Sequence, residues 1–147
     1  MARLHVGTLI YKKMPTIVKF EDIEAWQTAR ELTRMVYDLT RQGELARDFG
    51  LCDQMRRASV SIMSNIAEGF ESRTQQLLRE YLGRAKASAG ELRAQVYVAK
   101  DIGYLDQNEF SNLFELCDKC SRQISRFMQY LAQQPNTIRE EGIEYNV

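Results

Sequence analysis

The chain has 147 residues, 44% of them hydrophobic, which is enough for one compact domain. Twenty basic and twenty acidic side chains give a formal net charge of zero, which argues against a protein drawn to nucleic acid by its global charge alone. No apolar run approaches the length of a membrane helix, and we expect a cytoplasmic protein without a membrane partner.

The first predicted segment is a basic N-terminal arm over residues 1–19, extended rather than helical. It has no acidic side chain, and its four basic ones are Arg3, Lys12, Lys13 and Lys19. Met14 is a second candidate start for the chain. Pro15 and Pro135 are the two prolines of the sequence, so the interval between them has no proline to break a helix.

The first two helices are predicted from apolar residues that recur at spacings of three and four. This pattern indicates a helix over 22–41, which the polar residues around Gly43 end. A second helix is expected over 53–71, with Asp53 as the candidate cap at its start and Gly69 weakening its last turn.

A third helix is predicted to begin directly after the second, because Ser72 and Gln75 have the spacing of a reciprocal cap. Its apolar seam is the most regular in the chain and consists of Leu78, Leu82, Ala85, Ala89, Leu92, Val96 and Ala99. Gly103 is expected to end this helix. Asp106 with Glu109 forms the next capping pair, from which a fourth helix begins.

Residues 20–133 therefore predict an all-α fold, an antiparallel up-down four-helix bundle with short connections. Residues 134–147 carry three glutamates against one arginine and are predicted to be a flexible acidic C-terminal tail.

A row of polar side chains crosses the mostly apolar second helix at Arg57, Ser61, Asn65 and Glu68. Because an unpaired buried polar group costs about 1–3 kcal/mol, the row must be hydrogen-bonded, face solvent or bind something. The third helix offers a partner row at Arg84, Ser88, Glu91 and Gln95. We expect an ion pair between Arg57 and Glu91, supported by Ser61 and Ser88, which sets the register of the two helices.

A row of small residues follows another side of the third helix at Gly83, Ala87, Gly90 and Ala94. Two glycines inside an exposed helix cost about 1 kcal/mol each relative to alanine, so a compensating contact is expected. The small side chains would allow a close approach, either inside the bundle or between subunits. The alternative is a helix that is held by its other face and tolerates the glycines.

Basic residues seven apart form a stripe on the third helix: Arg79, Lys86, Arg93 and Lys100. Repeated around a ring of subunits, such stripes would follow phosphates without reading sequence. The other candidate nucleic-acid contacts are Arg122, Arg126, Lys12 and Lys13, and further extensions of the patch are Lys119, Arg30, Arg34 and Arg41. The competing interpretation is a solvated helix face paired with acids such as Glu80.

No active site, metal site or cofactor site is expected. Cys117 and Cys120 form a CxxC in mid-helix, where core packing is the simpler role, and Cys52 is a third reduced thiol. The sole histidine, His5, lies in the arm, so the Glu-x-x-His pairs of a di-iron bundle are absent. The aromatic residues that could stack bases or pack between helices are Trp26, Tyr37, Tyr81, Tyr97 and Tyr104.

One run of the second helix, with its flanks, carries a family resemblance. Its matching residues are Gln54, Arg56-Arg57-Ala58, Ser61-Ile62, Asn65-Ile66-Ala67-Glu68-Gly69, Tyr81-Leu82, Ala85, Ser88, Glu91-Leu92 and Gly103-Tyr104. The sequence resembles the four-helix-bundle proteins encoded in 23S rRNA intervening sequences, a family that partly overlaps the accessory proteins of diversity-generating retroelements. The resemblance covers roughly Phe20 to Leu131.

The resemblance implies a bundle that assembles as a ring-like homopentamer and binds nucleic acid, RNA or an RNA/DNA hybrid, with no catalytic residues. In retroelements the partners would be template RNA and a reverse transcriptase. Two alternatives stay open: a stand-alone intervening-sequence protein that binds ribosomal RNA, and a purely structural oligomeric interaction module.

Overall fold

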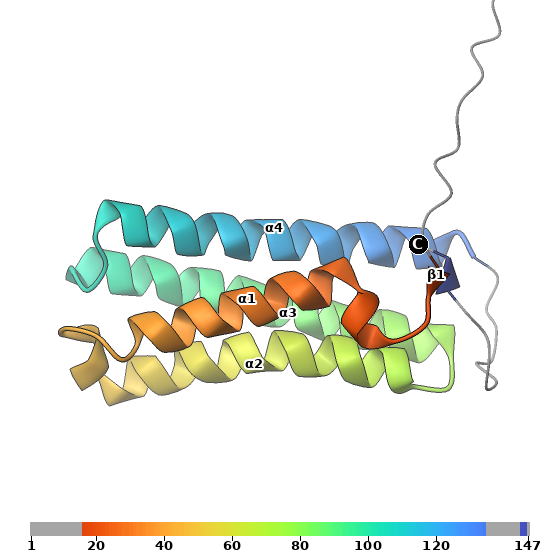
Figure 1. Ribbon diagram of the computed structural model, residues 1–147, viewed down its shortest axis with the longest axis horizontal. Coiled ribbons are helices and arrows are strands. Elements are labelled where there is room, and N and C mark those ends of the chain that lie inside the picture. Colours follow the sequence, from red (N-terminus) through yellow and green to blue (C-terminus); the bar gives the residue numbers. More distant parts are fainter. Residues whose placement is uncertain (1–15, 135–144, 147) are drawn as a thin grey trace, which may run out of the picture.

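The computed structural model describes residues 16–134 and 145–146, and within them four long helices form a bundle (Figure 1). The helices are α1 (Glu24–Leu39), α2 (Phe49–Glu71), α3 (Gln75–Ile102) and α4 (Gln107–Ala132). Two short 3-10 turns, η1 (Phe20–Asp22) and η2 (Leu45–Arg47), precede α1 and α2. Successive helices run in opposite directions, as short connections require.

The four helices surround one apolar core. α1 and α3 lie on opposite sides of it, α1 in front and α3 behind in Figure 1, and each packs against both α2 and α4. Every residue of the predicted α3 seam is buried, as are Leu32, Ile62 and Ile124 on the other helices. The spacing of three and four places these residues on one side of each helix, and burying them stabilises the bundle.

The beginning of α2 differs from its prediction. The helix begins at Phe49, four residues before Asp53, because the side chain of Asp48 accepts a hydrogen bond from the backbone N–H of Leu51 at 3.1 Å. The other carboxylate oxygen of Asp48 accepts a hydrogen bond from the hydroxyl of Tyr104 at 3.1 Å. Asp48 therefore caps α2 and also ties its start to the chain just after α3.

The predicted cap at Ser72 is wrong. Ser72 is the last cap residue of α2, and its hydroxyl donates to the carbonyl of Gly69. The cap of α3 is Thr74, which accepts from the N–H of Leu77 at 3.1 Å. The turn between α2 and α3 is as tight as expected, because only three residues separate the end of α2 at Glu71 from the start of α3 at Gln75.

The predicted end of α3 and the predicted start of α4 are confirmed. Gly103 ends α3 with a φ of 90°, a left-handed conformation that glycine adopts without a Cβ penalty. Asp106 and Glu109 form a reciprocal capping box at the start of α4.

Two short strands join the ends of the described chain. β1 (Thr16–Ile17) pairs in an antiparallel manner with β2 (Tyr145–Asn146), and Ile17 is buried against the bundle. The sequence did not predict this pairing, which brings residues of the predicted tail next to the end of the predicted arm. Residues 1–15 of the arm, and residues 135–144 and 147 of the tail, lie outside the described residues.

None of the helices in the described part of the chain has the length and apolar content that a membrane crossing would require.

Candidate nucleic-acid interface

The contact between α2 and α3 contains half of the predicted polar network. The hydroxyls of Ser61 and Ser88 lie 2.9 Å apart, and the amide of Asn65 donates to the carbonyl and hydroxyl of Ser61 at 2.8 and 3.0 Å. These bonds satisfy partly buried polar groups between two helices. They align α2 and α3 with Ser61 opposite Ser88.

The predicted ion pair between Arg57 and Glu91 is wrong. Arg57 pairs with Asp53, one turn earlier on α2, at 2.9 Å, and its side chain is 80% exposed. Glu91 instead accepts a hydrogen bond from Gln95 at 3.2 Å. Residues at i and i+4 are neighbours on one helix face, so this pair forms whatever the alignment of α2 and α3. Glu68, the last residue of the polar row, is exposed.

The small-residue row lies on the outer side of α3. Ala87, Gly90 and Ala94 are exposed and Gly83 is half-buried. A Cβ placed on Gly90 would meet no atom within 4 Å, and one on Gly83 would meet only the terminal methyl of Met128 at 3.9 Å. No contact inside the bundle therefore requires this row to be small.

The basic stripe reaches across the outer seam between α3 and α4. The Lys86 ammonium donates to the hydroxyl of Ser121 at 3.0 Å, and the Lys100 ammonium lies 4.0 Å from the centre of the Phe110 ring. Arg93 lies 3.7 Å from Asp118, and Arg122 of α4 lies 3.0 Å from the same carboxylate. We call these cations, with Arg79, the α3/α4 basic face; its members are Arg79, Lys86, Arg93, Lys100 and Arg122.

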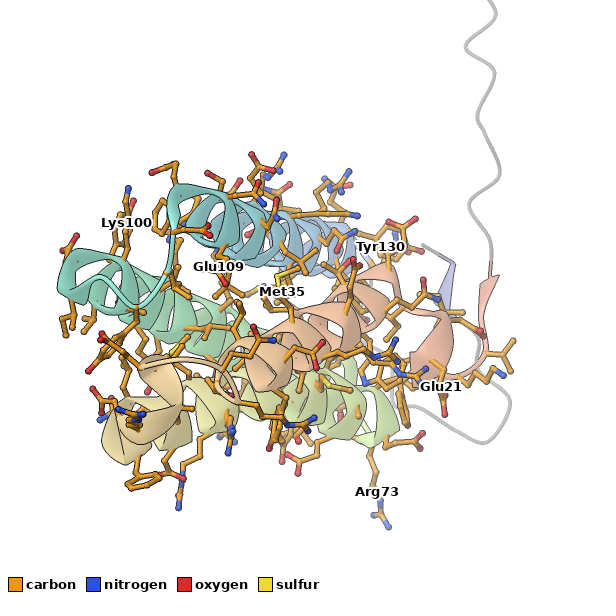
Figure 2. The ribbon with its side chains drawn as sticks, turned by 60° about the vertical axis from the view of Figure 1, so that its left-hand side comes forward. Glu21, Met35, Arg73, Lys100, Glu109 and Tyr130 are labelled. Carbon is orange, nitrogen blue, oxygen red and sulfur yellow. The ribbon has the colours of Figure 1, made fainter. Side chains whose placement is uncertain are left out.

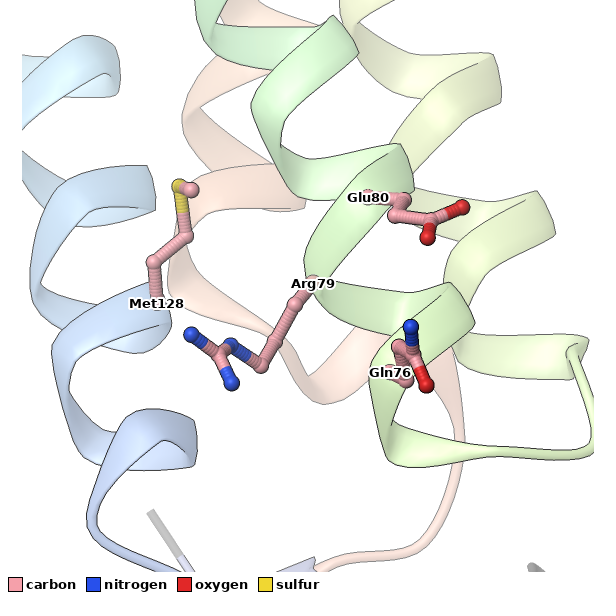
Figure 3. Close-up of a pocket in the computed structure, with 4 residues that line it drawn as sticks. All are labelled: Gln76, Arg79, Glu80 and Met128. Carbon is pink, nitrogen blue, oxygen red and sulfur yellow. The ribbon is translucent and has the colours of Figure 1, made fainter. Parts of the chain in front are cut away.

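A shallow hollow of about 460 Å³ lies at one end of this face (Figure 3). Arg79 extends from α3 toward α4, where Met128 lies, while Gln76 and Glu80 leave α3 on the other side. The opposite end of the face is at Lys100, beside the start of α4, far from Arg73 at the α2–α3 turn (Figure 2). Because seven residues of helix rise about 10.5 Å, the α3 stripe extends over roughly 31 Å.

The charges of the α3/α4 basic face are poorly balanced. Asp118 is the carboxylate that pairs with it, and it serves both Arg93 and Arg122. Among the residues that the structure describes, Arg79, Lys86 and Lys100 form no ion pair, and Glu80 does not pair with the stripe. Within the described ranges, three of the five cations therefore have no neutralising carboxylate.

The cations of α1 do not extend this face, contrary to the prediction. Arg41 lies over the ring of Tyr37 at 5.8 Å, and Arg56 of α2 lies over the same ring at 5.0 Å. Arg30 lies over Trp26 at 5.8 Å. Arg41 and Arg56 therefore share the Tyr37 ring where α1 meets α2, and α1 and α3 are on opposite sides of the bundle.

Two other predicted contacts have different surroundings. Arg126 is exposed on α4, one turn beyond Arg122. Lys119 lines a hollow between α1 and α4 together with Glu31 and Glu115, so its surroundings are partly acidic. Lys12 and Lys13 lie outside the described residues.

Burial governs the CxxC of α4. It raises the pKa values of the Cys117 and Cys120 thiols to about 12, and the Cys120 thiol donates to the carbonyl of Ala25 at 3.6 Å. Thiols held neutral in this way are poor nucleophiles and poor metal ligands. Within the described ranges, no group of His, Cys, Asp and Glu side chains could hold a metal ion.

An aromatic cluster at the Lys100 end of the face was not predicted. The ring centres of Tyr97, Phe110 and Phe114 are each 5.5 Å from one another. The signal was present in the sequence, because Tyr97 is four residues after Arg93 and three before Lys100, which places all three on one side of a helix. Only the packing of α4 against α3 brings the phenylalanines to them.

The sequence that forms this bundle matches a known family. The sequence pattern of 23S rRNA-intervening sequence proteins matches residues 21–126, most of the chain. The chain belongs to the 23S rRNA-intervening sequence protein family.

A solved structure from the S23 ribosomal protein family supports the fold of this family member. It is a protein of unknown function from Bacteroides thetaiotaomicron, 15% identical, with a TM-score of 0.66 over 71% of this chain and 95% of that chain. At this identity the likeness shows the fold alone. No protein with curated annotation matches the chain.

Proposed function

We propose that this 23S rRNA-intervening sequence protein is a non-catalytic scaffold that binds RNA through its α3/α4 basic face and works as a ring-like homo-oligomer, a pentamer. One observation carries the RNA binding: three of the five cations on this face have no ion-pair partner among the described residues. Unpaired cations in a row contribute most to the affinity for phosphates, because they give up no existing ion pair. Their binding also releases the counterions condensed on the nucleic acid.

The preferred role is that of an accessory protein in a diversity-generating retroelement, where the face would bind template RNA, or an RNA/DNA hybrid, and the ring would also hold the reverse transcriptase. The second candidate is a stand-alone protein that binds ribosomal RNA, and the family's name favours it. A neighbouring reverse-transcriptase gene with a repeated template supports the first role, whereas an insertion in a ribosomal RNA gene supports the second.

Charge-neutralising variants test the RNA binding. The variant Arg79→Gln/Lys86→Gln/Lys100→Gln is expected to flatten the dependence of log affinity on log salt by about 2–3 in slope, between about 50 and 200 mM salt. Fluorescence anisotropy with a labelled structured RNA measures both slopes. Direct phosphate contacts predict this change because each contact that is lost lowers the number of counterions released on binding, and this number sets the slope.

The matched control removes three cations from the opposite side of the bundle, as Arg30→Gln/Arg34→Gln/Arg41→Gln. It carries the same change of net charge and is expected to keep most of the wild-type slope. Equal loss in both variants would point to global charge and contradict a binding face. RNA binding that does not weaken with salt would contradict phosphate contacts on this face. No RNA binding at all would favour the third candidate, a purely structural interaction module.

A further inference from the structure

The tyrosines of the described chain differ in how their rings are covered. Two guanidinium groups cover Tyr37, Arg84 lies over Tyr81 at 4.9 Å, and the hydroxyl of Tyr104 binds Asp48. Tyr97 is 47% exposed, and in the described part of the chain no cation lies over its ring. Its half-exposed ring can therefore take a further planar group.

The surroundings of Tyr97 hold the ring in place. It meets Phe114 edge-on at 71° and Phe110 at 53°, so two rings of α4 pack against it. Phe110 is 8% exposed and gives the cluster a buried base. A ring fixed from behind loses little conformational entropy when a ligand stacks on its open side.

Two cations border this ring. Lys100 is one turn beyond Tyr97 and lies 4.0 Å from the Phe110 ring centre, while Arg93 is one turn before it and lies 5.9 Å from the Phe114 ring centre. One of them, Lys100, has no ion-pair partner among the described residues. An exposed aromatic face between cations is the combination that binds an unpaired base together with its flanking phosphates.

We infer that Tyr97, bordered by Arg93 and Lys100, is a stacking site for an unpaired base at one end of the α3/α4 basic face. The inference rests on the proposed function and adds a ligand class to it: nucleic acid with single-stranded nucleotides. A base in a duplex already stacks on its neighbours and cannot reach the ring without being unstacked. The rest of the face contacts phosphates, which duplex and single strand share.

Wild-type protein is first titrated with three labelled RNA probes of equal length: single-stranded oligouridylate, a fully paired duplex, and a strand with abasic sites in place of its bases. The inference predicts tightest binding to oligouridylate, by at least about 5-fold over the abasic strand, since each stacked base contributes on the order of that factor or more. A deoxyuridylate strand is expected to bind with similar affinity, because rings and phosphates are common to RNA and DNA.

Substitutions then locate the site. Tyr97→Leu keeps apolar packing on the two phenylalanines but removes the aromatic face. It is expected to lower the affinity for oligouridylate at least about 5-fold and to leave the affinity for the abasic strand unchanged. Tyr97→Phe should bind as the wild type does. Tyr37→Leu, on the opposite side of the bundle, is the matched control and should also leave both affinities unchanged.

A fluorescent version reads the stacking directly. In Trp26→Phe/Tyr97→Trp the single tryptophan is expected to be quenched by oligouridylate and not by the abasic strand. Equal wild-type affinity for oligouridylate and the abasic strand would overturn the stacking site while the phosphate-binding face stands. Absence of binding to every probe would overturn the face as well, and a strong preference for one sugar would contradict a site made of rings and phosphates.

Discussion

At the scale of single residues, burial rather than sequence motif decides the chemistry of the cysteines. Cys117 and Cys120 form a spacing known from redox and metal sites, but both thiols are buried in the bundle. Burial disfavours a charged thiolate, which raises the pKa of each thiol from 9.0 to about 12. The motif therefore belongs to the core.

Raised thiol pKa values predict a loss of stability at high pH. The unfolded chain loses these protons near pH 9 and the folded chain only near pH 12, so the thiols stabilise the folded state fully below pH 9, and this contribution falls as the pH rises toward 12. Urea unfolding at several pH values should show a shallower alkaline decline for Cys117→Ala/Cys120→Ala than for the wild type. Parallel declines would show that other groups govern the alkaline limit.

At the scale of elements, two glycines inside helices, Gly69 of α2 and Gly90 of α3, differ in how closely other atoms approach them. A Cβ on Gly69 would lie 2.7 Å from the Cβ of Tyr81 and 3.1 Å from Cδ1 of Leu78, so α2 and α3 approach closely at this residue. A Cβ on Gly90 would meet nothing within 4 Å. The first glycine is required by the α2–α3 contact and the second is not.

Alanine substitution separates these roles. Gly69→Ala is expected to destabilise the protein by about 1–3 kcal/mol, because backbone and side chains must move to admit the Cβ. Gly90→Ala is expected to stabilise it by about 0.5–1 kcal/mol through helix propensity alone. Urea unfolding monitored by circular dichroism measures both. A neutral Gly69→Ala would contradict the close approach, and a destabilising Gly90→Ala would reveal a contact that the single chain lacks.

At the scale of the whole molecule, the outer side of α3 combines an unused small-residue row with exposed apolar residues. Val98 and Ile102 continue the row toward the end of the helix and are 45% and 56% exposed. Small residues without a partner inside the bundle allow another subunit to approach closely, and cyclic assembly would repeat the α3/α4 basic face around an axis.

Light scattering coupled to size-exclusion chromatography tests this assembly. A pentamer of 17.1 kDa chains has a mass of about 85 kDa. Gly90→Leu should shift the mass toward that of one chain while the helical circular dichroism stays. Ser64→Leu enlarges an exposed residue of α2 and should leave the mass unchanged. A wild-type protein with the mass of one chain would contradict the ring.

Local sequence patterns were sufficient to predict the four helices, the buried seam of α3, and the caps at Gly103 and Asp106. These features depend on contacts within a few residues, where spacing and residue type decide the outcome. The same local rules misplaced the caps of α2 and α3, because each helix start offers two candidate cap residues close together. Asp53 was predicted where Asp48 is the cap, and Ser72 where Thr74 is the cap. The pairing of Arg57 failed for a similar reason, since Asp53 on its own helix was closer than Glu91.

The packing of the helices, in contrast, sets which cations share a face. The stripe on α3 was visible as a repeat of seven, but Asp118, Ser121 and the two phenylalanines of α4 are separated from it in sequence and reach it through helix packing. Packing also placed the arginines of α1 on the far side, where no local pattern could assign them. A charge pattern along one helix does not specify its neighbours, and the energy of a surface charge depends on those neighbours.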